Sequence, residues 1–293
     1  MSTLHGKVVL VTGGARGIGA ASARELAARG ARLVLTDVDA PPLEALVSEL
    51  GADVALGVVA DVCDLDAMEE AVAAGLERFG AIDVVLANAG VASYGSVARV
   101  DPAAFRRVLD VNVTGVFHTV RAALPALVRS RGYVLVVSSL AAFTPAPGLA
   151  AYNASKAGVE HFANALRLEV AHQGVSVGTA HMSWIDTPLV QDAKKDMSAF
   201  RELVESLPFP LNRTAEVDVC VQAFVHGIER RKRRVYAPRW VGAVSAARGL
   251  VASRLGDRAT RDLTPRLLPR MDEEVARLGR STAARYGGST TAS

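Results

Sequence analysis

A tyrosine and a lysine stand four residues apart in the run Tyr152-Asn153-Ala154-Ser155-Lys156. On a helix this spacing places both side chains on one face. A free phenol, with a pKa near 10, is a poor base at neutral pH, but a nearby ammonium and a helix N-terminus both stabilise the phenolate. The pattern predicts a lowered pKa for Tyr152, which would act as a general acid or base.

A glycine-rich turn near the start of the chain predicts a dinucleotide site. The run TGGARGIG at residues 12–19 follows an apolar strand-like segment and opens a helical pattern. Gly13 permits the sharp turn, Gly17 lets the backbone approach a pyrophosphate, and Gly19 lets the helix pack on the sheet. Unpaired N–H groups at the helix N-terminus bind the anion. The contacts expected in this turn are Gly13, Arg16, Gly17, Ile18 and Gly19.

Asp37 ends the next predicted strand, 18 residues beyond Gly19. A carboxylate at this place accepts hydrogen bonds from both hydroxyls of the adenosine ribose and repels a 2′-phosphate, so the sequence favours NAD over NADP. Arg16 is the counter-argument, because its guanidinium could reach a 2′-phosphate. The alternative for Arg16 is a surface side chain near the pyrophosphate.

The motifs of this chain, taken together, resemble those of the short-chain dehydrogenase/reductase family. The turn at residues 12–19 has three residues between its first and third glycines, Asn88-Ala89-Gly90 follows the fourth predicted strand, and the Tyr152 run follows the fifth. The resemblance covers about residues 5–237. It implies an oxidoreductase that transfers hydride between NAD(H) and a secondary alcohol or ketone, and a homodimer or homotetramer built through long helices.

The resemblance implies a catalytic set of four residues. Ser139, 13 residues before Tyr152, would hydrogen-bond the substrate oxygen, and the spacing favours it over Ser138. Lys156 would tune Tyr152 and hold the nicotinamide ribose, and Asn112 would hold a water in the proton relay. Each residue taken singly fits an ordinary structural role. A non-catalytic dinucleotide sensor or scaffold on the same fold is the alternative, but it has no need for all four side chains.

Further cofactor contacts are implied by the same resemblance. Asp61 would bind the exocyclic amine of the adenine, with Val62 beside it. Asn88 would lie in the turn beside the adenine ribose, although a structural role in the central sheet suits it equally. Ile185 and Thr187 would hold the nicotinamide carboxamide. The full set beyond the glycine-rich turn and Asp37 is Asp61, Val62, Asn88, Ala89, Gly90, Tyr152, Lys156, Ile185 and Thr187.

The chain departs from the family pattern beside the substrate. Met182-Ser183 stands where the family usually has Pro-Gly, and the loss of both turn formers puts the shape of this loop in doubt. Candidate walls of the substrate site are mostly apolar and include no converging arginines, which predicts a hydrophobic alcohol or ketone. These walls are Val91, Tyr94, Phe143, Leu149, Trp184 and residues 189–211.

Apolar runs alternate with helical patterns over residues 1–237 and must position these side chains. Continuous apolar runs are typical of strands covered on both faces, so we expect a Rossmann-like, doubly wound parallel α/β sheet of about seven strands. The predicted strands are Val8–Val11, Leu33–Leu35, Val54–Val59, Ile82–Leu86, Tyr133–Val137, Val175–Ala180 and Arg234–Ala237. The predicted helices are Gly19–Arg29, Leu43–Leu50, Asp64–Phe79, Ala103–Val128 and Ala215–Arg231.

Residues 238–293 form a basic extension without a good strand. Two or three helices are expected there, interrupted by Pro265 and Pro269, followed by a disordered end. From Arg230 onward there are 15 Lys and Arg against 5 Asp and Glu, whereas the preceding part has 18 against 25. Contact of this segment with an anionic membrane surface is one interpretation. A solvated surface with cations at helix ends is the favoured one.

Several classes of protein are excluded. No run of eighteen residues lacks a charge or turn former, so we expect no membrane-spanning helix. The chain has only two cysteines, Cys63 and Cys220, without a metal-type spacing. This predicts a cytoplasmic protein without a metal site. No zinc pattern, helix-turn-helix or basic aromatic face points to a nucleic-acid partner.

Overall fold

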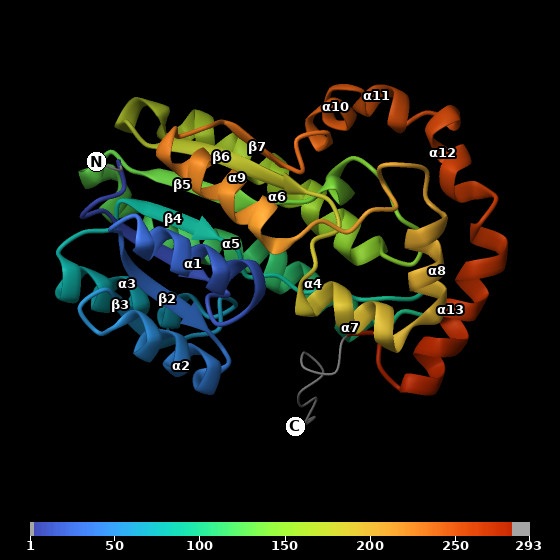
Figure 1. Ribbon diagram of the computed structural model, residues 1–293, viewed down its shortest axis with the longest axis horizontal. Helices are drawn as coiled ribbons and strands as arrows, with labels where there is room; N and C mark the ends of the chain where they lie inside the picture. The colour runs from blue at the N-terminus through green and yellow to red at the C-terminus, as the bar shows by residue number, and fades with distance from the viewer. Residues whose placement is uncertain (1–2, 283–293) are drawn as a thin grey trace.

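A single seven-stranded parallel sheet forms the centre of the protein, as the computed structural model of residues 3–282 shows (Figure 1). The strand order is β3-β2-β1-β4-β5-β6-β7, and every neighbouring pair is parallel. The predicted doubly wound α/β fold is therefore confirmed. The strands are β1 Val8–Thr12, β2 Arg32–Asp37, β3 Ala55–Val59, β4 Val84–Ala87, β5 Tyr133–Val137, β6 Ser176–Met182 and β7 Arg234–Ala237.

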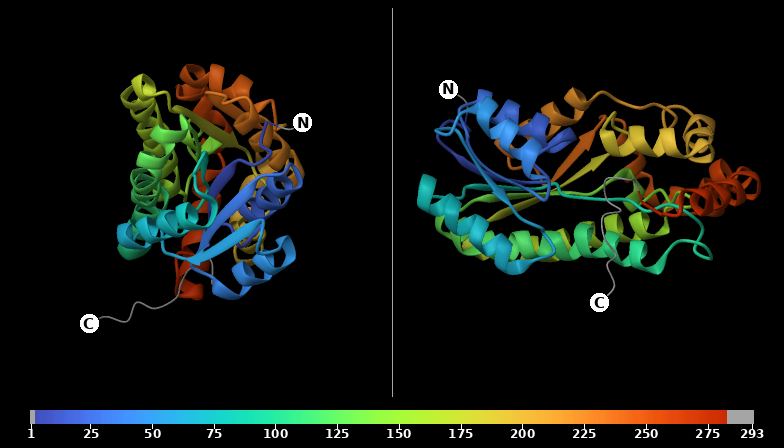
Figure 2. Two further views of the ribbon diagram at one scale, coloured as in Figure 1. Left: turned by 90° about the vertical axis from the view of Figure 1, so that its left-hand side faces the viewer. Right: turned by 90° about the horizontal axis from the view of Figure 1, so that it is seen from below.

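Helices cover both faces of the sheet (Figure 2). One face packs against α1 and α9, and the other against α3, α5 and α6. The helices are α1 Gly17–Ala28, α2 Ala40–Leu50, α3 Leu65–Phe79, α4 Pro102–Leu109, α5 Gly115–Ser130, α6 Ala150–Val170, α7 Pro188–Asp196, α8 Ser198–Ser206, α9 Val217–Glu229, α10 Val241–Ala246, α11 Arg248–Val251, α12 Arg254–Arg261 and α13 Thr264–Leu278.

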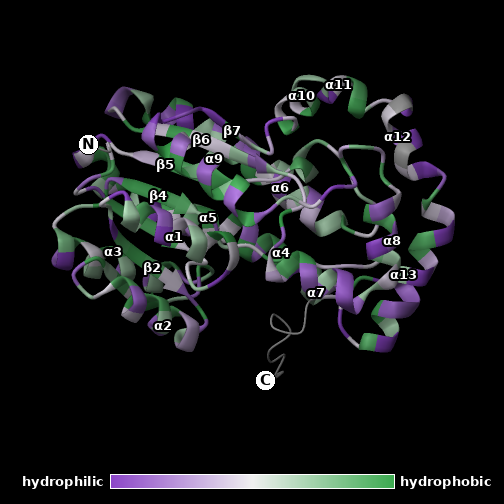
Figure 3. Ribbon diagram, in the orientation of Figure 1, coloured by the Kyte–Doolittle hydropathy of each residue, from purple (hydrophilic) through white to green (hydrophobic). Residues whose placement is uncertain are grey.

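The central strands are apolar along their whole length because both of their faces are covered. Every residue of β1, β4 and β5 is buried, as their continuous apolar runs predict. In Figure 3 these strands are predominantly hydrophobic, whereas α12 and α13 carry many hydrophilic residues. The chain order reverses between β1 and β4, and in open parallel sheets ligands bind beyond the carboxyl ends of the strands at such a switch point.

The predicted helix Ala103–Val128 is a longer and irregular element. It begins at Pro102, with Asp101 as N-cap, and a π-helical turn at Asp110–Thr114 separates α4 from α5. The combined segment Pro102–Ser130 is long and apolar enough to cross a membrane, but half of its most apolar window is buried inside the protein. Such burial is typical of a core helix.

The extension after β7 folds back along the main body as four helices, α10–α13, of which Figure 1 shows the last beside α8. Pro265 lies in the first turn of α13, where proline is tolerated. The expectation that Pro269 interrupts a helix is wrong, since this residue lies inside α13. Asp272 accepts hydrogen bonds from the backbone N–H and the hydroxyl of Ser96, both at 2.7 Å. The expected disordered end at residues 283–293 lies outside the described residues.

Arginines of the extension pair with acids of the main body. Arg248 donates to the buried carboxylate of Glu160 at 2.9 Å, and Arg270 bonds Glu202 at 2.6 Å. Arg280 completes the series with an ion pair to Asp196 at 2.8 Å. The opposite charges of the two parts of the chain therefore meet within the molecule.

Glu274 of α13 caps the start of α8. Its carboxylate is 8% exposed and accepts hydrogen bonds from the N–H groups of Ser198 and Ala199, each at 3.1 Å, and from the Ser198 hydroxyl. These N–H groups have no partner within α8, because the first turn of a helix lacks preceding carbonyls. A negative charge at this end also opposes the positive pole of the helix.

We predict that Glu274→Ala lowers the free energy of unfolding by about 3 kcal/mol, because it leaves buried donors without an acceptor. Chemical denaturation of the full chain measures this change. The control is Glu273→Ala, since Glu273 is an exposed neighbour on the same helix. Equal stability of the two variants would contradict the capping role of Glu274.

Candidate active site

Two open clefts meet beyond the carboxyl ends of the strands. The first has a cavity volume of about 200 Å³ and lies over the glycine-rich turn. The second has a cavity volume of about 180 Å³ and extends toward α8 and α12. Both are lined by the same five residues where they join, and Tyr152 is among them. These shared residues are Ile18, Tyr152, Met182, Thr187 and Leu189.

Most of the residues predicted to bind the cofactor line the first cleft, which we call the cofactor cleft. Two of them do not: Gly19 is buried in α1, and Ile185 lines the second cleft. A Cβ on Gly19 would lie 2.0 Å from the Gly13 carbonyl oxygen, so this glycine serves close packing. The predicted residues that line the cleft are Gly13, Arg16, Gly17, Ile18, Asp37, Asp61, Val62, Asn88, Ala89, Gly90, Tyr152, Lys156 and Thr187.

The glycine-rich turn has the backbone that its sequence predicts. Gly13 and Gly17 have φ angles of 63° and 53°, a region that side-chain-bearing residues rarely adopt. Asn88 donates both N–H groups of its amide, to the Thr12 carbonyl at 3.0 Å and the Gly13 carbonyl at 3.2 Å. Its side chain therefore joins β4 to the turn, which favours the structural of its two roles.

The carboxylate of Asp37 lies beside the same turn. It accepts hydrogen bonds from the backbone N–H groups of Ala15, at 3.0 Å, and Asp39, at 3.1 Å. Arg16 is directed to Asp39, with 3.2 Å between Nε and the carboxylate. The cleft therefore presents the Asp37 carboxylate at the end of β2, and Arg16 already has an acidic partner.

Asp61 is held by a residue that the sequence did not single out. Arg107 of α4 donates to one carboxylate oxygen of Asp61 at 2.9 Å, and the Cys63 N–H donates to the other at 2.9 Å. Burial alone would raise the pKa of Asp61, but these donors outweigh it and lower the pKa. Arg107 also lines the cofactor cleft, at a place set by the fold and not by a recognisable motif.

Tyr152 and Lys156 lie in the first two turns of α6, as their spacing predicts. The Lys156 ammonium is 5.6 Å from the centre of the Tyr152 ring and donates to the Val137 carbonyl at the end of β5 at 3.0 Å. Gly90 lies beside it, since a Cβ there would make van der Waals contact with Nζ at 3.4 Å. Lys156 is only 3% exposed, and this burial lowers its pKa to about 8.

The expected lowering of the Tyr152 pKa is not found in the protein alone. Burial raises the pKa of Tyr152, and a hydrogen bond with Ser139 opposes the shift without cancelling it. The physical reason is that desolvation penalises the phenolate more than the surrounding groups stabilise it. Tyr152 is therefore held as a neutral phenol, ready to donate a proton.

Ser139 and Ser138 have different surroundings. The Ser139 hydroxyl lines the second cleft beside Tyr152, accepts a hydrogen bond from the Ala141 N–H at 3.1 Å and makes a long bond, 3.5 Å, to the Met182 carbonyl. The Ser138 hydroxyl is buried and donates to the Lys156 carbonyl at 2.8 Å. Ser139 thus presents its hydroxyl to the second cleft beside Tyr152, whereas Ser138 fixes α6 to the end of β5.

The Asn112 side chain forms hydrogen bonds with other residues of the protein. It lies in the π-helical turn, accepts a hydrogen bond from the Val91 N–H at 2.8 Å, and donates to the Val91 carbonyl at 3.0 Å. It also donates to the Ser155 hydroxyl at 2.9 Å, which in turn donates to the Tyr152 carbonyl at 2.8 Å. Asn112 therefore positions the helix turn that bears Tyr152.

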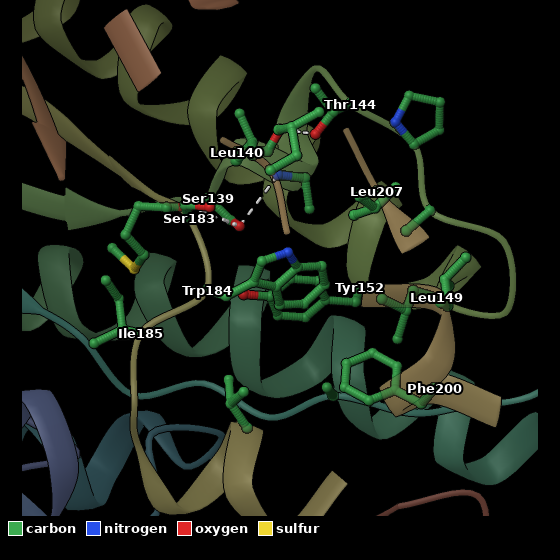
Figure 4. Close-up of a pocket in the computed structure, with 18 of the residues that line it drawn as sticks. Ser139, Leu140, Thr144, Leu149, Tyr152, Ser183, Trp184, Ile185, Phe200 and Leu207 are labelled. Carbon is green, nitrogen blue, oxygen red and sulfur yellow. Dashed lines mark hydrogen bonds between the residues drawn. The ribbon is translucent and has the colours of Figure 1, made fainter. Parts of the chain in front are cut away.

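The second cleft is lined mainly by apolar side chains, and Figure 4 shows those nearest Tyr152 and Ser139. Two predicted wall residues lie elsewhere: Val91 lines the cofactor cleft, and Phe143 packs against Val241 under Arg248. Sequence patterns missed the contribution of the extension, because it comes from residues that fold back over a long distance. The walls from the extension are Val251, Gly256, Asp257 and Thr260.

The cofactor cleft fits a nicotinamide dinucleotide. Gly13 and Gly17 form a cradle without side chains at the N-terminus of α1, where backbone N–H groups suit a pyrophosphate. Asp37 suits a ribose at one end, and Lys156 lies at the other, beside Tyr152. Within residues 3–282, no three His, Cys, Asp or Glu side chains gather as metal ligands.

Known proteins with similar sequences are oxidoreductases. Trans-4-hydroxycyclohexanecarboxylate dehydrogenase of Sinomonas cyclohexanicum is 34% identical over 218 residues, covering 72% of this chain and 81% of the relative. 11-beta-hydroxysteroid dehydrogenase 1A of Arabidopsis thaliana is 35% identical over 249 residues, covering 81% and 70%. An uncharacterized NAD-dependent oxidoreductase of Mycobacterium tuberculosis is 34% identical over 206 residues, covering 64% and 75%.

The family model described as short chain dehydrogenase matches residues 7–198. This match spans the sheet from β1 to β6, the glycine-rich turn and the Tyr152–Lys156 pair. Sequence, fold and relatives thus agree, and the chain belongs to the short-chain dehydrogenase family of oxidoreductases.

Proposed function

We propose that this protein transfers hydride between NAD(H) and a secondary alcohol or ketone, with Tyr152 as the general acid and base. The observation that carries the proposal is the meeting of the two clefts at Tyr152. Ser139 lies on the substrate side of this junction and Lys156 on the cofactor side. Dehydrogenase relatives over most of the chain support the same reaction class.

Each residue at the junction has a different role in the proton transfer. In ketone reduction, the Ser139 and Tyr152 hydroxyls donate to the carbonyl oxygen and orient it. Tyr152 then gives its proton to this oxygen, and the Lys156 ammonium stabilises the phenolate left behind. A bound nicotinamide would supply or accept the hydride. In alcohol oxidation, the Tyr152 phenolate takes the hydroxyl proton.

NAD is the proposed cofactor form. A 2′-phosphate near Asp37 would meet a carboxylate that is fixed by two backbone N–H groups. Arg16, the cation that could offset this repulsion, pairs with Asp39. The relative from Mycobacterium tuberculosis that is named NAD-dependent is consistent with this preference.

The proposed substrate is a hydrophobic, ring-shaped alcohol or ketone. Tyr94, Trp184 and Phe200 give the second cleft flat aromatic walls, which suit the faces of a ring. The named relatives act on a hydroxycyclohexanecarboxylate and a hydroxysteroid, both cyclic alcohols.

Tyr152→Phe tests the role of the phenol. We expect the variant to bind NADH normally but to lose turnover of cyclohexanone by about a thousandfold or more, because it cannot give a proton. NADH fluorescence measures binding, and NADH absorbance measures turnover. The control is Tyr236→Phe, whose lost hydroxyl bonds Ser245 outside both clefts. Undiminished turnover in Tyr152→Phe would refute the proposed acid.

The pH dependence of ketone reduction tests the role of Lys156. Its pKa of about 8 means that the ammonium is present below pH 8 and is lost as the pH rises. Because the charged ammonium stabilises the Tyr152 phenolate and the neutral amine does not, we expect kcat/KM to be constant below this pKa and to fall about tenfold per pH unit above it. Initial rates between pH 6 and 10 measure the profile. A rate that rises above pH 8 would contradict the proposal.

A further inference from the structure

Two buried polar groups in the wall of the substrate cleft have no protein partner among the described residues. They are the Ser183 hydroxyl and the indole N–H of Trp184. Ser183 is only 9% exposed, and the indole nitrogen is buried although the ring itself is partly accessible. Buried donors in proteins almost always have a partner, so two neighbouring exceptions in a cleft wall suggest that a ligand supplies it.

Backbone hydrogen bonds and ring packing hold Ser183 and Trp184 in place, and neither the Ser183 hydroxyl nor the indole N–H takes part. The Ser183 N–H donates to the Ala237 carbonyl at 2.9 Å, and the Trp184 carbonyl accepts from the Ala215 N–H at 2.8 Å. The Trp184 ring also packs edge-on against Phe200, with 5.6 Å between ring centres. Backbone pairing and packing therefore fix both residues and leave their donors for another molecule.

Both groups lie close to the reacting end of the cleft. Figure 4 shows Ser183 beside Ser139, with the indole nitrogen on the edge of the Trp184 ring that is turned toward these serines.

The charges around the cleft determine what these donors can bind. An indole N–H only donates, and a serine hydroxyl can donate or accept, so the shared partner is an acceptor oxygen. The described lining of the cleft includes no Lys, Arg or His, and its single charged residue is Asp257. A carboxylate would lack a cation and face Asp257, whereas an uncharged oxygen needs only the two donors.

We propose that Ser183 and Trp184 form a subsite for a second, uncharged oxygen of the substrate, such as an ether, hydroxyl or ketone. The proposal rests on the proposed function, because it places this oxygen on the molecule whose carbonyl meets Tyr152. It narrows the substrate class from hydrophobic cyclic ketones to cyclic ketones with a further neutral oxygen substituent.

Matched ligand pairs test the subsite by binding alone. The 2-, 3- and 4-methoxycyclohexanones are compared with the corresponding ethylcyclohexanones, which have similar shape but no ether oxygen. Dissociation constants are measured by calorimetry in the presence of NAD, with which a ketone cannot react. The variants are Ser183→Ala and Trp184→Phe. The control is Thr144→Val, because Thr144 lines the same cleft but donates its hydroxyl to the Leu140 carbonyl at 2.8 Å.

The wild-type protein is expected to favour at least one methoxy compound over its ethyl partner. This preference should fall by about three- to tenfold in each variant, the effect of one lost hydrogen bond, and stay unchanged in Thr144→Val. Tighter binding of 4-oxocyclohexanecarboxylate than of 4-methoxycyclohexanone would overturn the claim that the subsite binds an uncharged oxygen. The proposal would also be overturned if wild type and both variants preferred the methoxy compounds to the same degree. It would likewise be overturned if the wild-type protein showed no preference for a methoxy compound, or bound none of the compounds. If the wild-type protein prefers a methoxy compound over its ethyl partner but does not reduce these ketones with NADH, only the proposed function is refuted.

Discussion

A buried ammonium beside a phenol that faces both clefts is the constraint around which this protein is built. Lys156 has almost no contact with solvent, and its burial lowers its own pKa. Such a group stays in place only if neighbouring dipoles accept its N–H groups. The end of β5 supplies the Val137 carbonyl, and Gly90, in the turn after β4, lies beside the nitrogen. The ends of these two strands thus fix the point at which both clefts meet.

The helix that bears Tyr152 is held to the sheet by side-chain hydrogen bonds from neighbouring elements. Ser138 bonds the Lys156 carbonyl, and Ser155 links the Tyr152 carbonyl to Asn112. Asn112 can reach Ser155 because the π-helical turn sets it between α4 and α5. The irregular turn, which interrupts an otherwise apolar helix, therefore has a positional role in the site.

Periodicity and short motifs predicted the sheet, the glycine-rich turn and the face shared by Tyr152 and Lys156, because these depend on neighbours in the sequence. They did not predict what depends on distant contacts. Arg107 reaches Asp61 across 46 positions, and Val251 and Thr260 enter the substrate cleft only because the extension folds back. Phe143 was misplaced for the same reason. The pKa of Tyr152 was misjudged because spacing reports a nearby cation but not the degree of burial.

The central claim is that the two clefts bring a nicotinamide and a ketone together at Tyr152. Reduction of cyclohexanone with NADH that carries deuterium at both C4 positions, followed by mass spectrometry and NMR of the product, tests it most directly. The account predicts cyclohexanol with one deuterium on the carbon that bears the hydroxyl. Cyclohexanol without deuterium, or no reaction by the folded wild-type protein with cyclohexanone or the methoxycyclohexanones, would contradict it.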